Sequence, residues 1–352
     1  MRILVTGASG FAAEHLIPKL KELNHYIIGL DRKPNASAKV DDYICLDLAS
    51  DNLSEMLEIS VDLVIHLAAA RADWGISDEE FYRDNVVATE NLIKAISRLE
   101  VKRFIFTSSI SVMPQDSEYP LDEQCPNGPI NAYGKSKETA ENLLIQYTKT
   151  KQDFCLNILR PTVLYGPSDP ENTGIYRSMD NNIFRLIDNI AKNRFAFVGN
   201  ENTIKTAAYV DNFVDSIIFL MTPRTGYRIY IYCDMPYFET GKLVRTIRKL
   251  LGKKGIGPSI PYNVAKILAL VFDKIGTRFK VNFPITTARI NTFNRPTHFK
   301  RDALDAEGFV QNITNDEALQ KTVSWYKETM KARRIRTFFL RAEIPQKNRK
   351  EN

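Results

Sequence analysis

The stretch Tyr133-Gly134-Lys135-Ser136-Lys137 carries a phenol and an ammonium group that together can perform acid–base chemistry. A tyrosine and a lysine four positions apart lie on one face of a helix, about one turn from each other. There the ammonium can stabilise a phenolate and lower the pKa of the tyrosine from about 10 towards neutrality. Such a phenol can act as general acid or base towards an alcohol or a ketone. An exposed pair gives the same spacing by chance, so this hypothesis depends on the surrounding elements.

A dinucleotide site is predicted at the start of the chain. Residues 2–6 form an apolar strand in this prediction, a glycine turn covers residues 7–13, and residues 14–23 have helical spacing. Backbone N–H groups and the helix N-terminus converge at such a turn and create an anion site. The second strand, residues 25–30, ends in Asp31, about 20 residues beyond the glycines, where an acid can bind an adenosine ribose.

Asp31 also bears on the choice of cofactor, because its charge would repel the 2′-phosphate of NADP. The neighbouring Arg32 could offset part of that repulsion. We therefore favour NAD as the cofactor and keep NADP as the alternative.

Strands and helices continue to alternate as far as Pro161. Further strands are predicted at residues 43–46, 61–67, 104–107 and 155–159, and helices at residues 51–59, at 79–99 and around Tyr133. This order predicts an α/β fold with a Rossmann-type, doubly wound parallel sheet. The glycine turn, Asp31, Ala68 and Ser109 all follow strands, so we expect them at the carboxyl edge of the sheet, where such folds bind ligands.

The second half of the chain is predicted to form a smaller C-terminal substrate-binding lobe. We expect an NAD(P)-binding domain over residues 1–165, mainly the substrate-binding lobe over 166–330, and a basic tail over 331–352, with later elements free to return to the sheet. Helices are predicted at residues 182–192, 209–221 and 261–272, and a strand at 195–199. The last helix carries an apolar stripe, for which we favour a core or lid helix over a membrane role; its residues are Val264, Ile267, Leu268, Val271 and Phe272.

Composition excludes several classes of protein. The hydrophobic content of 44% and charged content of 26% are ordinary for a soluble globular protein. Four scattered cysteines fit a reduced, cytoplasmic compartment and argue against a metal site. We expect no signal peptide and no membrane span, since the first apolar run leads directly into the glycine turn and no later one approaches about 20 residues.

The formal net charge of +6 is concentrated in the tail, residues 331–352, where eight basic residues face two acidic ones. A nucleic-acid-binding protein would carry its basic surface on the folded domain, so we expect no nucleic-acid partner. The tail could contact an anionic membrane, but we favour a solvated or loosely docked C-terminus.

These motifs, in this order, resemble the extended short-chain dehydrogenase/reductase superfamily, in its NAD-dependent epimerase/dehydratase branch. The resemblance covers about residues 1–330 and rests on T-G-A-S-G-F-A-A (6–13), Asp31, Asp47-Leu48, H-L-A-A (66–69), Asn85, Thr89, Ser108-Ser109, Y-G-K-S-K (133–137), L-R-P-T (159–162) and the closing segment with Gly308-Phe309 and residues 322–326. Residues 71–84, 207–212 and 284–289 look most like a polysaccharide-biosynthesis subgroup of 4-epimerases and 4-keto reductases for UDP-linked amino sugars.

The resemblance implies a role for each matching position. It implies cofactor contacts from Gly7, Ser9, Gly10, Phe11, Ala13, Asp31, Arg32, Asp47, Leu48, Leu67, Ala68, Ala69, Asn85, Ser108, Lys137 and Pro161. Tyr133, Lys137 and Ser109 would be catalytic: Lys137 would bind the nicotinamide ribose and lower the pKa of Tyr133, and Ser109 would hydrogen-bond the reacting oxygen. His66 is expected to be a packed or solvent-facing strand residue, and a homodimer is expected.

Three positions depart from the family pattern. Ser109-Ile110-Ser111 replaces the threonine-aspartate-glutamate of the dehydratases, so the acids that eliminate water are missing. Val163 stands where many epimerases have an asparagine, and Met113 where a tyrosine is common, so the sugar pocket is expected to differ.

Three functions follow from these observations. The first is an NAD-dependent epimerase acting at C4 of a nucleoside-diphosphate hexose, with a 4-keto-sugar reductase that uses NAD(P)H as its alternative. The second is a hydroxysteroid- or dihydroflavonol-type dehydrogenase, to which the apolar stripe and Val163 lend support. The third, a cofactor-binding regulatory protein without activity, is disfavoured because Ser109, Tyr133 and Lys137 are all present.

Overall fold

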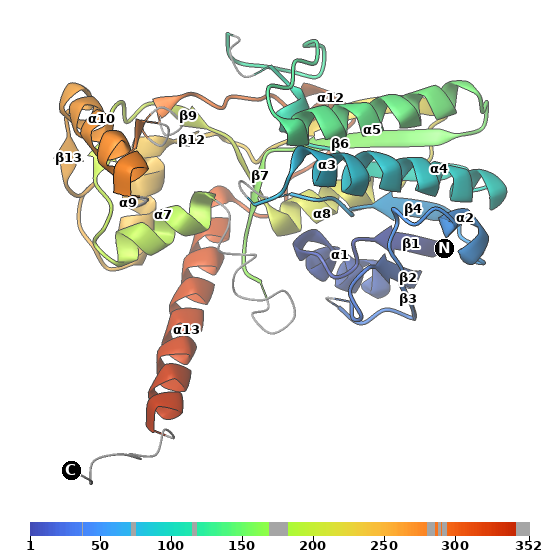
Figure 1. Ribbon diagram of the computed structural model, residues 1–352, viewed down its shortest axis with the longest axis horizontal. Helices are drawn as coiled ribbons and strands as arrows, with labels where there is room; N and C mark the ends of the chain where they lie inside the picture. Colours follow the sequence, from blue (N-terminus) through green and yellow to red (C-terminus); the bar gives the residue numbers. More distant parts are fainter. Residues whose placement is uncertain are drawn as a thin grey trace.

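The computed structural model of the protein describes residues 1–36, 38–71, 75–114, 118–168, 182–279, 286–287, 290 and 294–342. Within these ranges, the side chains of residues 274–279 and 333–342 are outside the description. Two lobes are visible in Figure 1, a larger one built on a sheet and a smaller one from which the last helix projects.

A seven-stranded sheet, with every adjacent pair parallel, forms the centre of the larger lobe. Its order is β11 (Gly226–Tyr232), β6 (Cys155–Pro161), β5 (Arg103–Thr107), β4 (Leu63–His66), β1 (Arg2–Thr6), β2 (Tyr26–Asp31) and β3 (Asp42–Cys45). Strands β4 and β6 are buried at every residue, as parallel strands covered on both faces are expected to be. Strands β2 and β3 extend the sheet on one side of β1 and β4, β5 and β6 on the other, so the strand order reverses between β1 and β4, the point where doubly wound sheets bind ligands. The predicted fold class is confirmed.

Helices cover both faces of the sheet (Figure 1). On one face, α1 (Phe11–Glu22) and α8 (Val210–Phe219) pack with Ile3 and Val5 of β1, and α12 (Asp302–Ala306) adds Leu304. On the other face, α4 (Ala88–Arg98) and α5 (Ala132–Lys149) pack with Leu4 of β1. Alternate residues of one strand therefore belong to two separate hydrophobic cores, which fixes the register of the sheet.

The helix predicted at residues 79–99 consists of three segments: α3 (Asp78–Phe81), a π-helical turn η1 (Tyr82–Val87) and α4. A capping box between Ser77 and Glu80 begins it. The helix predicted at residues 51–59 is shorter, with α2 covering Leu53–Met56. A 3-10 turn, η2 (Ile110–Val112), follows β5. Turns of the π type are frequent near functional sites, and this one carries Asn85.

The smaller lobe combines helices with short strands. Its elements, with two strands at the junction, are β7 (Val163–Tyr165), α7 (Asn182–Ala191), β8 (Phe197–Val198), β9 (Ile204–Lys205), β10 (Ala207–Tyr209), β12 (Phe238–Glu239), α9 (Thr240–Leu250), β13 (Ser259–Ile260), α10 (Tyr262–Phe279) and α13 (Asn315–Ala342). Phe184, Ile187 and Val244 belong to a core of its own. The subgroup segment 284–289 and the tail beyond Ala342 lie mostly or entirely outside the described residues.

The apolar stripe of α10 is not in the core, so the prediction of a core helix is wrong, whereas the lid alternative stays a prediction. Val264, Ile267 and Val271 are 48%, 64% and 48% exposed. The helix packs through the opposite side, where Ala265 and Ala269 are completely buried. Alanines let the helix approach the lobe closely, and the larger side chains are consequently left in solvent.

Candidate active site

The glycine turn brings backbone against backbone at the carboxyl end of β1. Gly7 has a φ of +70°, and a side chain there would place its Cβ 2.7 Å from the backbone nitrogen of Ala68. A Cβ on Gly10 would lie 2.9 Å from the carbonyl oxygen of Gly7. A side chain at either position would force the neighbouring backbone to shift. With glycine at both positions the turn stays tight and leaves room for a flat ligand at the N-terminus of α1.

A crevice opens beside this turn and contains many of the predicted cofactor residues. Of those predicted, its lining includes Gly7, Gly10, Asp31, Arg32, Asp47, Leu48, Leu67, Ala68 and Ala69. Strand ends and small side chains form its walls, which suits a dinucleotide. These residues therefore fit an NAD molecule with its adenosine end towards Asp31 and Asp47.

Ser9 fixes the carboxylate of Asp31 at the end of β2. Its backbone nitrogen and its hydroxyl donate to Oδ2 of Asp31 at 3.1 and 2.7 Å, and the backbone nitrogen of Lys33 donates to Oδ1 at 3.1 Å. The carboxylate is thus held rigidly in the crevice wall. Ser9 would therefore contribute to cofactor binding by positioning Asp31 and not by direct contact.

A chain of charges lies at the end of the crevice formed by Asp31, Arg32, Asp47 and Asp84. Nη1 of Arg32 donates to Oδ2 of Asp84 at 2.7 Å, and Arg83 bridges Asp84 and Asp47. Burial acts to raise the pKa of the Asp47 carboxyl. Hydrogen bonds from Ala49 and Arg83 have a larger effect than burial and hold this pKa below its usual range. Because Arg32 is engaged by Asp84, less of its charge is available to a 2′-phosphate, which favours NAD.

The remaining predicted cofactor residues are not part of the lining of this crevice. Phe11 and Ala13 belong to the first turn of α1, where Phe11 packs edge-on against His15 and Ala13 is buried. Asn85 uses its amide to hold the loop after β4, exchanging hydrogen bonds with the backbone of Ala70 and donating to Ser136 at 2.9 Å. Pro161 ends β6, opposite Tyr232 of β11.

Tyr133 lies in the first turn of α5, where Asn131 caps the helix by accepting from the backbone nitrogen of Gly134 at 2.7 Å. A side chain on Gly134 would overlap the carbonyl oxygen of Ser111. The glycine therefore lets α5 approach the turn after β5, and this close approach brings Tyr133 to Ser109. The ring of Phe81 lies 5.8 Å from the ring of Tyr133, centre to centre.

Burial of the phenol raises the pKa of Tyr133, while the charge of Arg71 and a hydrogen bond with Ser109 act in the opposite direction. Our expectation of a lowered pKa is therefore wrong for the protein's own groups. Lys137 does not supply the stabilisation that the spacing suggested. Its ammonium lies 4.1 Å from the centre of the Phe106 ring, and burial lowers its pKa to about 7, although Glu141 acts to raise it.

The two serines after β5 have different environments. Ser109 accepts from the backbone nitrogen of Ser111 and donates to its hydroxyl, both at 3.1 Å. The hydroxyl of Ser108 is buried and has no hydrogen-bond partner among the described residues. Such a hydroxyl is unfavourable unless something pairs with it, so a ligand group at this edge would satisfy it.

The motif L-R-P-T places a buried ion pair behind the site. Nε of Arg160 donates to Oε1 of Glu141 at 2.9 Å, and both side chains are almost completely buried. A nitrogen of Arg160 also lies 3.3 Å from the sulfur of Met113, where the family resemblance leads to the expectation of a tyrosine. His66 is buried between Thr6 and Thr89 and its pKa is lowered to about 3 by burial, which agrees with a packed role.

Sequence reasoning missed Arg71 and a second cavity. Arg71 follows β4 in a loop, and no periodicity in the sequence indicates that its charge reaches Tyr133.

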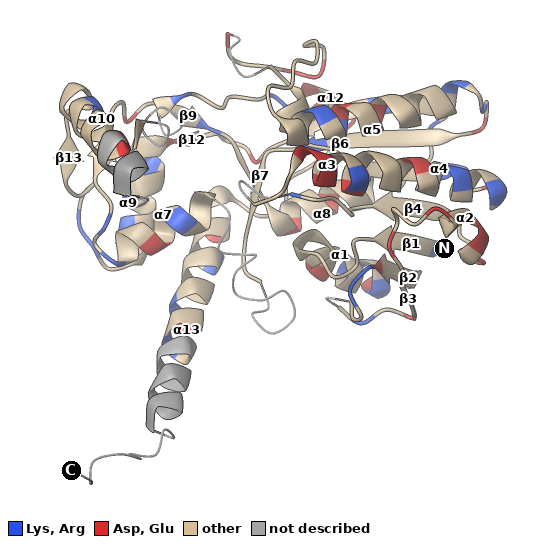
Figure 2. Cartoon of the chain, viewed as in Figure 1, with Lys and Arg blue, Asp and Glu red and all other residues tan. Residues whose placement is uncertain are grey.

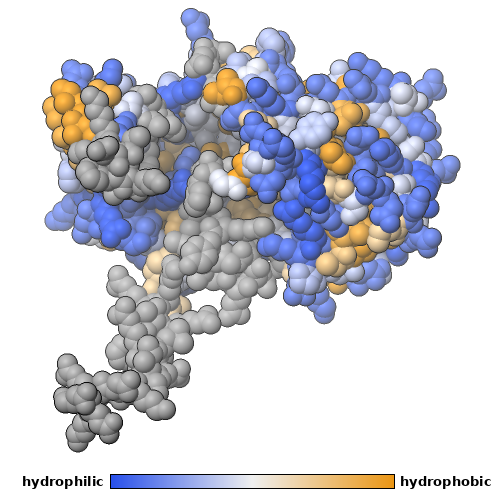
Figure 3. All heavy atoms as spheres, in the orientation of Figure 1, coloured by the Kyte–Doolittle hydropathy of each residue, from blue (hydrophilic) through white to orange (hydrophobic). Residues whose placement is uncertain are grey.

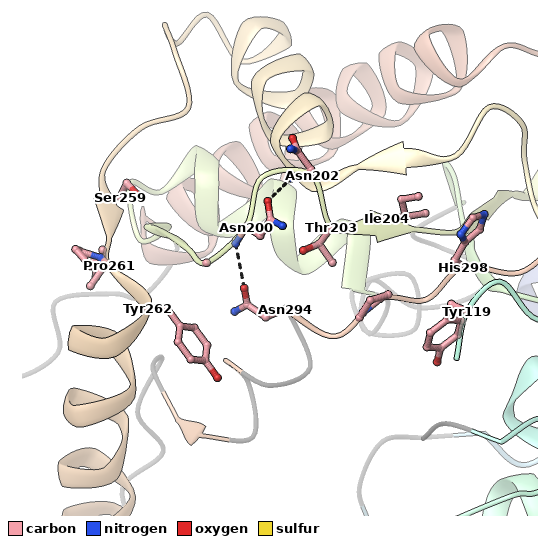
Figure 4. Close-up of a pocket in the computed structure, with 13 residues that line it drawn as sticks. Tyr119, Asn200, Asn202, Thr203, Ile204, Ser259, Pro261, Tyr262, Asn294 and His298 are labelled. Carbon is pink, nitrogen blue, oxygen red and sulfur yellow. Dashed lines mark hydrogen bonds between the residues drawn. The ribbon is translucent and has the colours of Figure 1, made fainter. Parts of the chain in front are cut away.

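The second cavity has a volume of about 830 Å³ and lies mainly in the smaller lobe (Figure 4). Polar groups from distant segments meet in it, including Tyr119, Asn200, Thr203, Asn294 and His298. The backbone nitrogen of Asn200 donates to Oδ1 of Asn294 at 3.3 Å.

The described residues contain neither a metal site nor a membrane-spanning helix. No group of histidine, cysteine and acidic side chains there could hold a metal ion. None of the helices in the described part has the length and apolar content to span a bilayer.

The sheet order, the glycine turn and the Ser–Tyr–Lys set define a class of protein: Rossmann-fold enzymes of the extended short-chain dehydrogenase/reductase type. Residues 3–231 match the model of the NAD dependent epimerase/dehydratase family. The chain belongs to this family, is an enzyme of this kind and has NAD as its cofactor, as the sequence predicted.

Individual relatives agree with this assignment. The chain is 31% identical to the N-acetyl-alpha-D-glucosaminyl-diphospho-ditrans,octacis-undecaprenol 4-epimerase of Escherichia coli O157:H7, over 92% of this chain and 94% of the relative. It is 26% identical to the UDP-glucose 4-epimerase of Vibrio cholerae, over 77% of this chain and 82% of that one. The structure of the UDP-glucose 4-epimerase of Thermotoga maritima with UDP-glucose resembles it with a TM-score of 0.71, at 17% identity, over 94% of this chain and 100% of that one.

Proposed function

We propose that this protein is an NAD-dependent 4-epimerase of nucleoside-diphosphate hexoses and that Tyr133 is its acid–base group. The observation that carries the proposal is the meeting of Tyr133 with Ser109 and the charge of Arg71 beside the dinucleotide crevice. The 4-epimerases among its relatives support the choice of reaction.

The site residues divide the work at the C4 carbinol. Bound NAD would supply the hydride acceptor for C4 and, in its reduced form, the hydride donor for the return step. Tyr133 takes the hydroxyl proton of C4 and gives it back, and Ser109 donates a hydrogen bond to the same oxygen. Arg71 favours the phenolate form of Tyr133 against the effect of burial. We assign to Lys137, one turn along α5 from Tyr133, the contact with the ribose next to the reacting ring.

The second cavity supports a role for the smaller lobe in holding the rest of the substrate. Its volume suits a ligand of the size of a sugar diphosphate, and its amides, hydroxyls and imidazole are donors suited to phosphate and sugar oxygens. A side chain at Gly199, which has a φ of +93°, would overlap Asn294 and close part of this space.

A panel of substrates tests the proposal. UDP-glucose, UDP-N-acetylglucosamine and N-acetylglucosamine linked to polyprenyl diphosphate are incubated with the protein as purified, without added NADH. Inversion at C4 supports the epimerase. Turnover only of a 4-keto sugar with NADH consumed would mean a reductase, and oxidation of a steroid alcohol alone would mean a hydroxysteroid-type dehydrogenase.

The polyprenyl-diphosphate sugar is a second candidate substrate. The Escherichia coli relative, which matches over nearly the whole chain, is named for such a substrate. Both candidates share a hexose on a diphosphate, so the same chemistry at C4 serves either.

A further inference from the structure

One face of α10 exposes a continuous row of large apolar side chains. Val264, Ile267, Leu268 and Val271 follow the i, i+3, i+4, i+7 spacing of one helix face, and each is more than a third exposed. Leu270 extends this surface at 50% exposure. Figure 3 shows the apolar atoms gathered at the corner of the molecule where α10 lies in Figure 1. We call Val264, Ile267, Leu268, Leu270 and Val271 the α10 face.

The α10 face differs from the other exposed apolar residues of the described chain. Leu23, Met56 and Val310 belong to separate elements or loops. Scattered residues of this kind need no explanation, whereas a contiguous apolar patch indicates an interaction surface.

The chain around the α10 face is strongly basic. From Thr240 to Phe272 there are seven lysines and arginines and no acidic residue. One of them, Arg245, pairs with Glu201, and Arg248 and Lys253 donate to backbone carbonyls, so most of this charge is not neutralised by these contacts. Lys266 is exposed on α10 itself. Figure 2 shows basic positions on α9 and α10.

The α10 face is also next to the second cavity. Ser259, Ile260, Pro261 and Tyr262, which lead into α10, line that cavity (Figure 4). Whatever the α10 face contacts is therefore brought to the rim of the space that we assign to the substrate.

We propose that the α10 face docks on an anionic lipid bilayer and presents the second cavity to a sugar diphosphate carried on a polyprenyl lipid. The substrate part of this inference rests on the proposed function. An apolar helix face with lysines and arginines around it is suited to lie in the interface of an anionic membrane. No described helix can span a bilayer, so the contact is peripheral. A second copy is disfavoured as the occupant, because a two-fold contact would bring together two surfaces on which basic residues outnumber acidic ones.

Vesicle binding tests the docking surface directly. The full chain is sedimented with vesicles of phosphatidylglycerol and phosphatidylethanolamine, next to the double variant Ile267→Glu/Val271→Glu. The control is Val310→Glu, which places a carboxylate at an equally exposed apolar residue outside α10. We expect the double variant to bind at least about tenfold more weakly and the control to bind as the wild type does. Absence of binding by the wild type, or equal binding by the double variant, overturns the proposal.

Activity measurements separate this inference from the proposed function. The double variant should lose turnover of a polyprenyl-diphosphate sugar in vesicles but keep its turnover of that sugar with a short, water-soluble prenyl chain. Equal losses with both substrates would overturn the docking role. If the wild type turns over none of the sugars, the proposed function fails, and vesicle binding alone decides the bilayer contact. A double variant that changes from dimer to monomer, with unaltered vesicle binding, would make the α10 face a subunit interface and overturn the proposal.

Discussion

The ammonium of Lys137 lies 4.1 Å from the centre of the Phe106 ring, one helical turn from Tyr133. Lys137 is only 1% exposed, and burial lowers its pKa to about 7. The lysine is therefore held in a position that suits a charged ligand better than it suits the stability of the fold.

Lys137→Met should stabilise the protein while removing activity. Because the folded state lowers the pKa of Lys137, folding below pH 7 requires burial of the charged form, and this cost declines as the pH rises from 7 towards 10.5. We expect the free energy of unfolding to rise in the variant by up to a few kcal/mol near pH 6.5, at about 1.4 kcal/mol for each pKa unit, and by much less near pH 10. Denaturant unfolding at both pH values measures this, with the exposed Lys135→Met as control. Equal gains at both pH values would show that titration of Lys137 is not the cause.

Tyr133→Phe should reduce turnover by about 10²–10⁴-fold, because the proton of the reacting hydroxyl then has no side chain to receive it. Binding of NAD should persist, since the phenol does not line the dinucleotide crevice. Tyr147→Phe removes a hydroxyl from the same helix, at a ring that packs on Phe154, and should leave turnover unchanged. Full turnover by Tyr133→Phe would exclude the assigned role.

Gly7→Ala should abolish the retention of NAD and lower the melting temperature. The new Cβ would lie 2.7 Å from the backbone of Ala68, in addition to the cost of a φ of +70°. Gly252→Ala is a matched control, because its φ is +75° and nothing lies within 4 Å of the built Cβ. The control should lose about 1 kcal/mol of stability and keep NAD, measured by absorbance of the released cofactor. If both variants keep NAD, the close approach at Gly7 does not shape the site.

Asp31→Asn should shift cofactor preference towards NADP by about tenfold or more, through loss of charge next to the 2′-position. The hydrogen bonds from Ser9 would be weakened in the same variant. Asp42→Asn removes an equal charge at the other end of the neighbouring strand β3 and should leave the preference unchanged. The ratio of the two dissociation constants is the measurement, and an unaltered ratio in Asp31→Asn would place the adenosine ribose elsewhere.

Features that depend on local pattern were predictable from the sequence. The glycine turn and Asp31 follow from strand–turn–helix order, since each lies at the end of an apolar run, and the Tyr133 helix follows from the spacing of Tyr133 and Lys137. The strand β11 was missed, although Tyr227, Ile229 and Ile231 alternate as strand residues do, because it returns to the sheet after a long excursion.

Features that depend on tertiary packing were not predictable. Helical spacing at Val264 and Ile267 shows that one face of α10 is apolar, but not which face is buried. The helix packs through Ala265 and Ala269, and small residues such as these give no periodic signal of their own in the sequence. The environment of Lys137 was missed for the same reason, because the spacing to Tyr133 does not reveal the Phe106 ring behind the lysine.

The fate of the C4 hydrogen tests the epimerase mechanism most directly. A UDP-hexose, or the polyprenyl-diphosphate sugar if that is the one turned over, is labelled with deuterium at C4 and epimerised in ordinary water. The account predicts that the product keeps the deuterium at C4, because the hydride leaves and returns within one bound complex while only the hydroxyl proton exchanges through Tyr133. Loss of deuterium from C4 to the solvent would contradict it.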